Sequence, residues 1–174
     1  MSQAQLENAA AQICERFPHS AILGIDGWTG AGKTTLAQQI GTLRVPIWPL
    51  DIDAFLSPRD GKYKEALQLQ SLRAAIKSAT VPIVASGVCL LEVFQLIGLQ
   101  LDSHIYLKRL NAGVWADEGE ALGNDLETHQ AAGLKRDVLR TEIRDYHLNF
   151  RPHEVADLVV DLAVEPQQVV HRLS

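Results

Sequence analysis

The sequence predicts an α/β fold with three layers, in which helices cover both faces of a mainly parallel, five-stranded sheet. Short apolar runs alternate with segments of helical character, and a glycine-rich loop joins the first run to the helix after it. Alternating strands and helices give parallel strands, because each helix carries the chain back to the edge where the previous strand began. The 174 residues suffice for one domain, and we expect its core at about 20–164, with an N-terminal helix within 1–18.

Each element follows from a local pattern. Apolar residues at i, i+4 and i+7 mark a first helix, which Pro18 ends because proline cannot continue a helix. Gly41 is placed to end the second helix. Pro46 and Pro49 make the second strand irregular and indicate an exposed sheet edge. The expected strands are 21–26, 45–52, 81–85, 103–107 and 157–164. The expected helices are 6–17, 35–42, 69–79, 89–97 and 139–150.

The glycine-rich loop, residues 27–34, reads G-W-T-G-A-G-K-T and fills every fixed position of the Walker A pattern G-x-x-x-x-G-K-[ST]. Glycines let the backbone wrap around an anion, so that its N–H groups and the next helix N-terminus point at phosphates. Lys33 can reach the β- and γ-phosphates, and the Thr34 hydroxyl can bind Mg²⁺. The strand before the loop and the helix after it predict a P-loop NTPase fold; the alternative is a glycine-rich turn without a ligand. The candidate nucleotide-binding residues are Gly27, Trp28, Thr29, Gly30, Ala31, Gly32, Lys33, Thr34 and Thr35.

Composition and charge exclude several other classes of protein. The net charge of −5 gives no general attraction to nucleic acid or to anionic lipid. No apolar stretch approaches the roughly 18 residues of a membrane span, and residues 1–17 do not resemble a signal peptide. Cys14 and Cys89 are too few for a disulfide framework or a metal site. We therefore expect a cytoplasmic protein with no nucleic-acid or membrane partner; an oligomer is compatible with the sequence.

Two carboxylates, Asp51 and Asp53, stand at the carboxyl end of the second expected strand. We expect this strand beside the first one, at the edge where ligands bind in such sheets. Residues two apart on a strand face the same side. One carboxylate can then accept the proton of a hydroxyl that attacks the γ-phosphate, while the other binds Mg²⁺ or the substrate. The alternative is a solvated acidic strand end.

Three segments of the chain resemble the uridine kinase, phosphoribulokinase and pantothenate kinase group. Residues 53–56 (D-A-F-L) resemble its D-x-F-[YL] segment, and residues 82–91 resemble its third strand, which ends in E-G-[IV]-x-L-L. Tyr146 with Pro152 and residues 156–160 resemble its closing segment. The resemblance implies transfer of the γ-phosphate of ATP, with Mg²⁺, to a hydroxyl of a nucleoside or similar metabolite. It also implies that Asp53, rather than Asp51, is the catalytic base.

Ser86 departs from that group, which has a Mg²⁺-binding glutamate at this position. A neutral hydroxyl is a weaker ligand for a hard cation. We therefore expect Asp51, with Thr34, to bind the metal, or a water to replace the glutamate, or turnover to be slow. The alternative function is a nucleotide-binding regulatory protein, or a weak ATPase, that has lost phosphotransfer.

A row of cationic residues, Arg136, Arg140, Arg144 and His147, is spaced to lie on one helical face. In small-molecule kinases, arginines near this point close over the phosphates and stabilise charge in the transition state. We expect Arg136 or Arg140 to do so here. The alternative is a solvated face paired with acidic neighbours at 137, 142 and 145.

Residues 111–130 occupy the position of a lid, but they are acidic, which favours a plain solvated loop or a cationic partner over a triphosphate cover. Trp28, inside the phosphate loop, is expected to be exposed if the loop is open. Tyr63 and Lys64 fall where the kinase group binds its acceptor, with a surface helix start as the alternative. Arg59 is a candidate contact for an anionic acceptor.

Overall fold

Five parallel strands form the centre of the computed structural model, which describes residues 2–57, 62–123 and 138–164. The strands lie in the order β2-β3-β1-β4-β6, and a short strand, β5, pairs antiparallel with the end of β4. The prediction of a mainly parallel five-stranded sheet is therefore confirmed. The strands are β1 (Ile22–Gly27), β2 (Trp48–Asp51), β3 (Ile83–Ser86), β4 (Ser103–Asn111), β5 (Val114–Trp115) and β6 (Leu158–Ala163).

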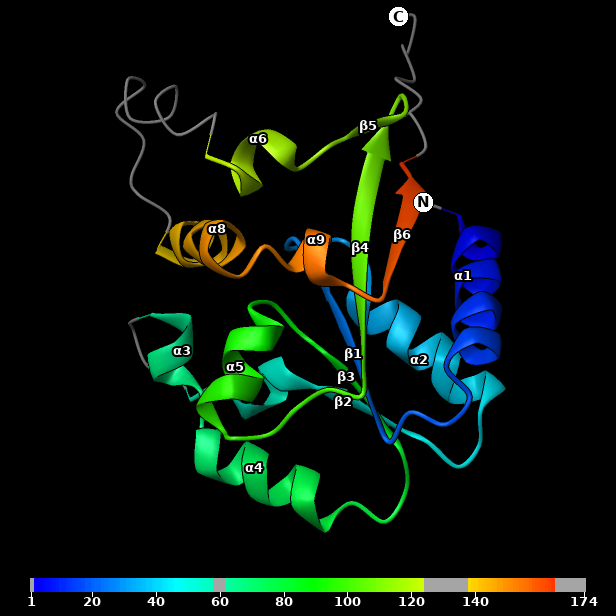
Figure 1. Ribbon diagram of the computed structural model, residues 1–174, viewed down its shortest axis with the longest axis vertical. Helices are drawn as coiled ribbons and strands as arrows, with labels where there is room; N and C mark the ends of the chain where they lie inside the picture. Colours follow the sequence, from blue (N-terminus) through cyan, green and yellow to red (C-terminus); the bar gives the residue numbers. More distant parts are fainter. Residues whose placement is uncertain (1, 58–61, 124–137, 165–174) are drawn as a thin grey trace, which may run out of the picture.

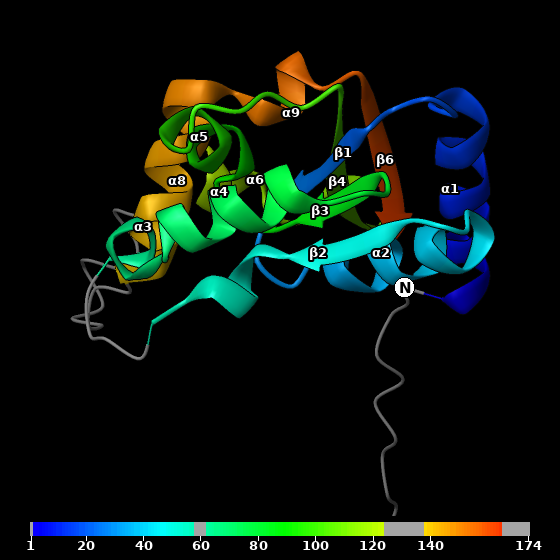
Figure 2. The same ribbon diagram turned by 90° about the horizontal axis from the view of Figure 1, so that it is seen from below.

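Helices cover both faces of the sheet, which confirms the three-layer prediction (Figures 1 and 2). The helices α1 and α2 pack on one face around a core that includes Leu23 and Ile25. The helices α4, α5 and α8 pack on the other face, around Leu50 and Ala85. The helices are α1 (Gln3–Arg16), α2 (Lys33–Leu43), α3 (Tyr63–Ala66), α4 (Leu69–Ser78), α5 (Leu90–Leu96), α6 (Glu118–Ala121), α8 (Val138–Phe150) and α9 (Pro152–Val155), with a 3-10 helix, η1, at Ile52–Phe55.

The sheet order corrects one prediction. The strand β2 does not lie beside β1, because β3 is hydrogen-bonded between them. As Pro46 and Pro49 indicate, β2 is an edge strand, and within the described residues it pairs with β3 alone. In these three strands Ile25, Ser86 and Asp51 are register partners, so their side chains face the same side of the sheet. The carboxyl end of β2 therefore reaches the phosphate loop across Ser86.

Helix α2 corrects the role of Gly41, because it continues through this glycine and ends at Leu43. A Cβ placed on Gly41 would lie 2.7 Å from Cγ of Pro49. The glycine is thus needed for the close approach of α2 to β2, not as a helix terminator.

We expect Gly41→Ala to lower the free energy of unfolding by about 1 kcal/mol. Overpacking against the proline ring costs about 1–3 kcal/mol, whereas the better helix propensity of alanine returns about 1 kcal/mol. Chemical denaturation measures the difference. Gln38→Ala, at an exposed position of the same helix, is the control and should change the free energy by less than about 0.5 kcal/mol. A Gly41→Ala protein as stable as the wild type would refute the close-packing explanation.

None of the helices within 2–57, 62–123 and 138–164 combines the length and the apolar character needed to cross a bilayer.

Candidate phosphate-binding site

The glycine-rich loop connects β1 to α2 at the carboxyl edge of the sheet. Gly27 has φ +149°, and a Cβ there would lie 2.7 Å from the carbonyl oxygen of Leu107 on the neighbouring strand. Gly32, directly before α2, has a left-handed φ of 92°. Both conformations favour glycine over other residues. The backbone of residues 27–35 is therefore bent between strand and helix as the Walker A pattern predicts, with the N-terminus of α2 at the end of the loop.

Lys33 lies under this loop and is 8% exposed. Its Nζ donates hydrogen bonds to the carbonyl oxygens of Gly27, at 3.0 Å, and Trp28, at 2.8 Å. Burial lowers the pKa of Lys33, and the charges of Asp26, Asp53 and other nearby acidic groups oppose this shift. The ammonium group is thus the cation at the centre of an acidic site.

The side chain of Trp28 is buried, which corrects the expectation that it is exposed. It is 2% exposed, and its ring meets that of His147 edge to face at 5.5 Å. His147 is itself fully buried, so it does not share a surface with the arginines of α8. Its Nδ1 must donate to the carbonyl oxygen of Ile143, at 2.6 Å, which leaves Nε2 to accept from the Tyr106 hydroxyl. Only the backbone of Trp28 is therefore available to a ligand.

Three oxygen-bearing side chains meet where α2 begins. The Thr34 hydroxyl donates to Oδ2 of Asp51 at 3.3 Å. Ser86, the register partner of Asp51, is 1% exposed, and among the described residues its hydroxyl has no hydrogen-bond partner. Hydroxyl and carboxylate oxygens are the ligands that Mg²⁺ accepts, and an unsatisfied buried hydroxyl is uncommon without a ligand or water. The residues therefore fit a magnesium ion, with Asp51 as the charged ligand.

Asp53 does not lie on a strand, as its spacing from Asp51 suggested. The strand ends at Asp51, whose Oδ1 accepts the N–H of Asp53 at 3.0 Å and so starts the 3-10 helix η1. The carboxylate of Asp53 nevertheless acts on the charge of Lys33. Its Oδ1 accepts a hydrogen bond from the Tyr63 hydroxyl at 2.6 Å. The turn of η1, not strand alternation, therefore sets the position of Asp53 beside the Tyr63 hydroxyl.

Tyr63 is the first residue of α3, in agreement with the alternative of a helix start at this point. It does not lie on the surface, however, because it is only 7% exposed. Burial raises the pKa of Tyr63, so its hydroxyl stays a donor to Asp53. Its N–H donates to Oε2 of Glu142 on α8. Tyr63 therefore connects the carboxylate at the phosphate loop with a helix from the far end of the sequence.

A buried carboxylate, Asp26, lies directly before the loop and was missed in the sequence. Its Oδ1 accepts the N–H of Gly27 at 2.7 Å, and its Oδ2 accepts the hydroxyl of Tyr146. That hydroxyl also accepts the N–H of Leu91 at 3.2 Å. Asp26 thus ties the start of the loop to α8 and α5. The available signal was an acidic residue inside the otherwise apolar run 22–27.

The arginines of α8 have acidic partners. Arg140 pairs with Glu120 of α6 at 2.9 Å, and Arg144 pairs with its neighbour Asp145. Arg136 and Arg59 lie outside the described residues.

The described part of the acidic segment 111–130 is not a plain solvated loop, which corrects that expectation. Asp117 is 3% exposed and forms an ion pair with Arg109 of β4. Arg109 was not a candidate in the sequence. Asp125 and Glu127 lie outside the described residues.

The comparisons with known proteins concern the whole fold. No protein-family model matches the chain. The fold is similar to that of a possible uridine kinase from Bacillus stearothermophilus, with a TM-score of 0.58 over 90% of this chain and 100% of that one. The two proteins therefore share an α/β fold. Sequence identity in this comparison is 17%, so the likeness is one of fold alone.

Proposed function

We propose that this protein is a kinase that uses ATP and Mg²⁺ to phosphorylate a hydroxyl of a nucleoside or similar small metabolite. The observation that carries the proposal is the position of Asp53. Its carboxylate is oriented by the hydroxyl of Tyr63, and its negative charge opposes the lowering of the pKa of Lys33 by burial, which supports a place near the phosphate loop. A P-loop protein that only binds or hydrolyses nucleotide does not require a proton acceptor for an alcohol at this point, whereas phosphoryl transfer to an alcohol does.

Each group has a separate role in the proposed reaction. The loop backbone and the ammonium group of Lys33 hold the phosphates, and Asp53 takes the proton of the attacking hydroxyl through Oδ2, since Oδ1 is occupied by Tyr63. Thr34 and Asp51 hold the metal, with Ser86 beside them. When bound there, Mg²⁺ neutralises charge on the β- and γ-phosphate oxygens. Arg140 remains a candidate contact for the phosphates.

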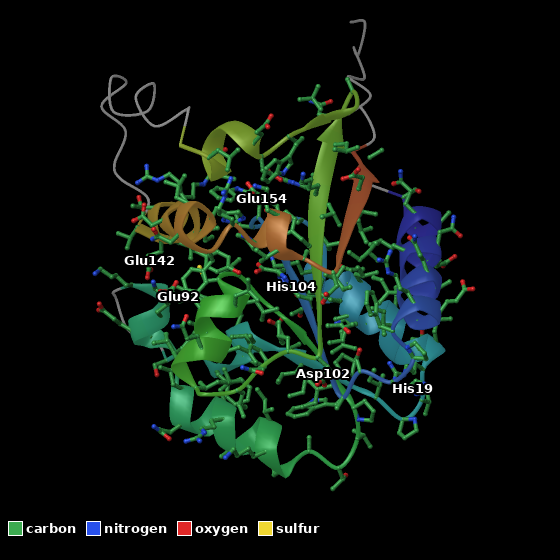
Figure 3. The ribbon with its side chains drawn as sticks, viewed as in Figure 1. His19, Glu92, Asp102, His104, Glu142 and Glu154 are labelled. Carbon is green, nitrogen blue, oxygen red and sulfur yellow. The ribbon has the colours of Figure 1, made fainter. Side chains whose placement is uncertain are left out.

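The surroundings of Tyr63 favour an acceptor that donates hydrogen bonds and carries no negative charge. Glu142 is 7% exposed, and among the described residues its Oε1 has no hydrogen-bond partner. Glu92, labelled with Glu142 in Figure 3, binds Lys64 at 2.7 Å, so the lysine is already neutralised, and the charges of both glutamates favour a raised pKa of Lys64. A nucleoside or polyol fits these carboxylates better than its phosphate ester does.

The test is ATP and GTP consumption with Mg²⁺, measured with and without a panel of nucleosides, sugars and vitamins and their phosphate esters. Stimulation by one neutral hydroxyl compound, with the phosphorylated compound as product, is the expected result. Stimulation by phosphate esters alone would contradict the acceptor chemistry while leaving the kinase assignment intact.

The second candidate function is a nucleotide-binding regulatory or weakly ATP-hydrolysing protein. Ser86 favours it, because a neutral hydroxyl stands beside Asp51 where the kinase group has a carboxylate. Tight ATP binding with slow hydrolysis that no compound stimulates would support this function over the first.

A further inference from the structure

Arg109 of β4 brings a guanidinium group against the phosphate loop. In the register of β1 and β4, Gly27 at the start of the loop is opposite Leu107. Arg109 is two residues further on and faces the same side. A Cβ placed on Gly30, in the middle of the loop, would lie 3.6 Å from Nη1 of Arg109. The guanidinium therefore reaches over the end of β1 to the backbone that the proposed function places around phosphate.

Asp117 holds this guanidinium by two of its three nitrogens. Nε donates to Oδ2 at 3.1 Å, and Nη2 donates to Oδ1. The aspartate is 3% exposed, whereas the arginine side chain is 33% exposed. In the part of the chain that the structure describes, Nη1 has no acceptor, and it is the nitrogen nearest Gly30. The ion pair thus fixes the guanidinium plane and leaves one nitrogen directed at the loop.

A tight hairpin builds this arrangement. Ala112 and Gly113 both have positive φ, at 49° and 82°, as a two-residue type I′ turn requires. The turn pairs Asn111 with Val114, and the N–H of Ala116 donates to the carbonyl oxygen of Arg109 at 2.8 Å. The next residue is Asp117. The register of the hairpin therefore delivers the aspartate to the arginine, and no long-range contact is needed.

We infer that Arg109 binds the polyphosphate of the nucleotide and that Asp117 is its positioning residue. This inference rests on the proposed function, because it assumes that a nucleoside triphosphate occupies the loop. The negative charge of Asp117 also opposes the lowering of the pKa of Lys33 by burial, so the ion pair lies within electrostatic reach of the loop lysine. A planar guanidinium donates parallel hydrogen bonds to phosphate oxygens, and here Asp117 already fixes the orientation of the guanidinium plane. Arg109 would add a second fixed cation to Lys33 in a site that otherwise holds Asp51 and Asp53.

The experiment measures the dissociation constants of Mg·ATP and of inorganic tripolyphosphate with Mg²⁺ by calorimetry. Arg109→Ala is expected to raise both dissociation constants about tenfold or more. Arg109→Lys keeps the charge but loses the planar fork, so its dissociation constants should lie between those of the wild type and Arg109→Ala. Lys108→Ala is the matched control. It removes the same charge from the next residue, whose side chain faces the other way and lies over the Trp115 ring at 4.7 Å. Its dissociation constants should stay within about twofold of those of the wild type.

Asp117→Asn tests the positioning role. It should weaken the binding of both ligands less than Arg109→Ala does. In the double variant it should not weaken binding further, because the aspartate favours binding only by positioning the arginine and its own negative charge opposes the phosphates.

Three results would overturn the inference alone. If Arg109→Ala lowers the melting temperature but leaves both dissociation constants unchanged, the ion pair only anchors the hairpin. If ATP binding weakens and tripolyphosphate binding does not, the guanidinium contacts the base or ribose. If Lys108→Ala weakens binding as much as Arg109→Ala, only general charge matters. Wild-type protein that binds neither ligand would instead refute the proposed function, and the inference with it. Should Arg109→Ala not fold, Arg109→Lys and Asp117→Asn decide by the same criteria.

Discussion

Asp53→Asn is expected to lower turnover at least about a hundredfold while leaving the dissociation constant of Mg·ATP within about twofold of the wild-type value. The asparagine side chain has the same shape, and its oxygen can still accept the Tyr63 hydroxyl, which Asp53 accepts at 2.6 Å. The amide cannot take a proton from the attacking alcohol, however. Steady-state kinetics with the stimulating acceptor and calorimetry with Mg·ATP separate the two effects.

Glu65→Gln is the matched control for this variant. Glu65 lies on α3 with Tyr63, and its side chain is 70% exposed. The variant removes one negative charge near the site without touching the hydrogen bond to Asp53. It should keep turnover within about twofold of wild type. If Asp53→Asn turns over at a near-wild-type rate, Asp53 is not the base, whatever the control does.

The sequence was sufficient for the parts of the site that depend on neighbouring residues. Gly27, Lys33 and Thr34 lie close together because strand, loop and helix follow one another directly, so the Walker A pattern predicted the bent loop between β1 and α2. Asp51 beside Thr34 was also predicted, although for a partly wrong reason. Its strand was expected next to β1, whereas β3 lies between them. Local periodicity identifies strands but does not encode their order in the sheet.

The predictions that were wrong concern residues whose positions depend on turns or on contacts between segments far apart in the sequence. Asp53 was treated as a strand residue, because alternation cannot reveal that Asp51 caps a 3-10 helix there. Trp28 was expected to be exposed, because the sequence does not reveal that its ring packs on a histidine 119 positions further along, His147. The pairing of Arg109 with Asp117 was predictable in principle. Asparagine, alanine and glycine between Leu110 and Val114 are a hairpin signal, although no hairpin was predicted at this point.

The second large effect is expected at Lys33. Lys33→Ala should raise the dissociation constant of Mg·ATP at least about a hundredfold and abolish measurable turnover. A hundredfold corresponds to about 2.8 kcal/mol, and hydrogen bonds to a charged group contribute roughly 1.5–3 kcal/mol each. Loss of one or two contacts between the ammonium and the phosphates therefore accounts for the expected change. Calorimetry measures it, and tight ATP binding by Lys33→Ala would contradict the role of the lysine.

The alanine variant could lose affinity for a different reason, because Nζ also donates to the loop carbonyls of Gly27 and Trp28. Those bonds hold the loop when no phosphate is bound, so their loss could let it collapse. Lys33→Arg separates the two explanations, since it keeps a cation and donors for the carbonyls but changes the position of the charge. If the charge position matters, Lys33→Arg should keep wild-type thermal stability and still bind Mg·ATP at least about tenfold more weakly. If loop collapse is the cause, the arginine variant should bind ATP normally, and affinity should follow melting temperature across all three proteins.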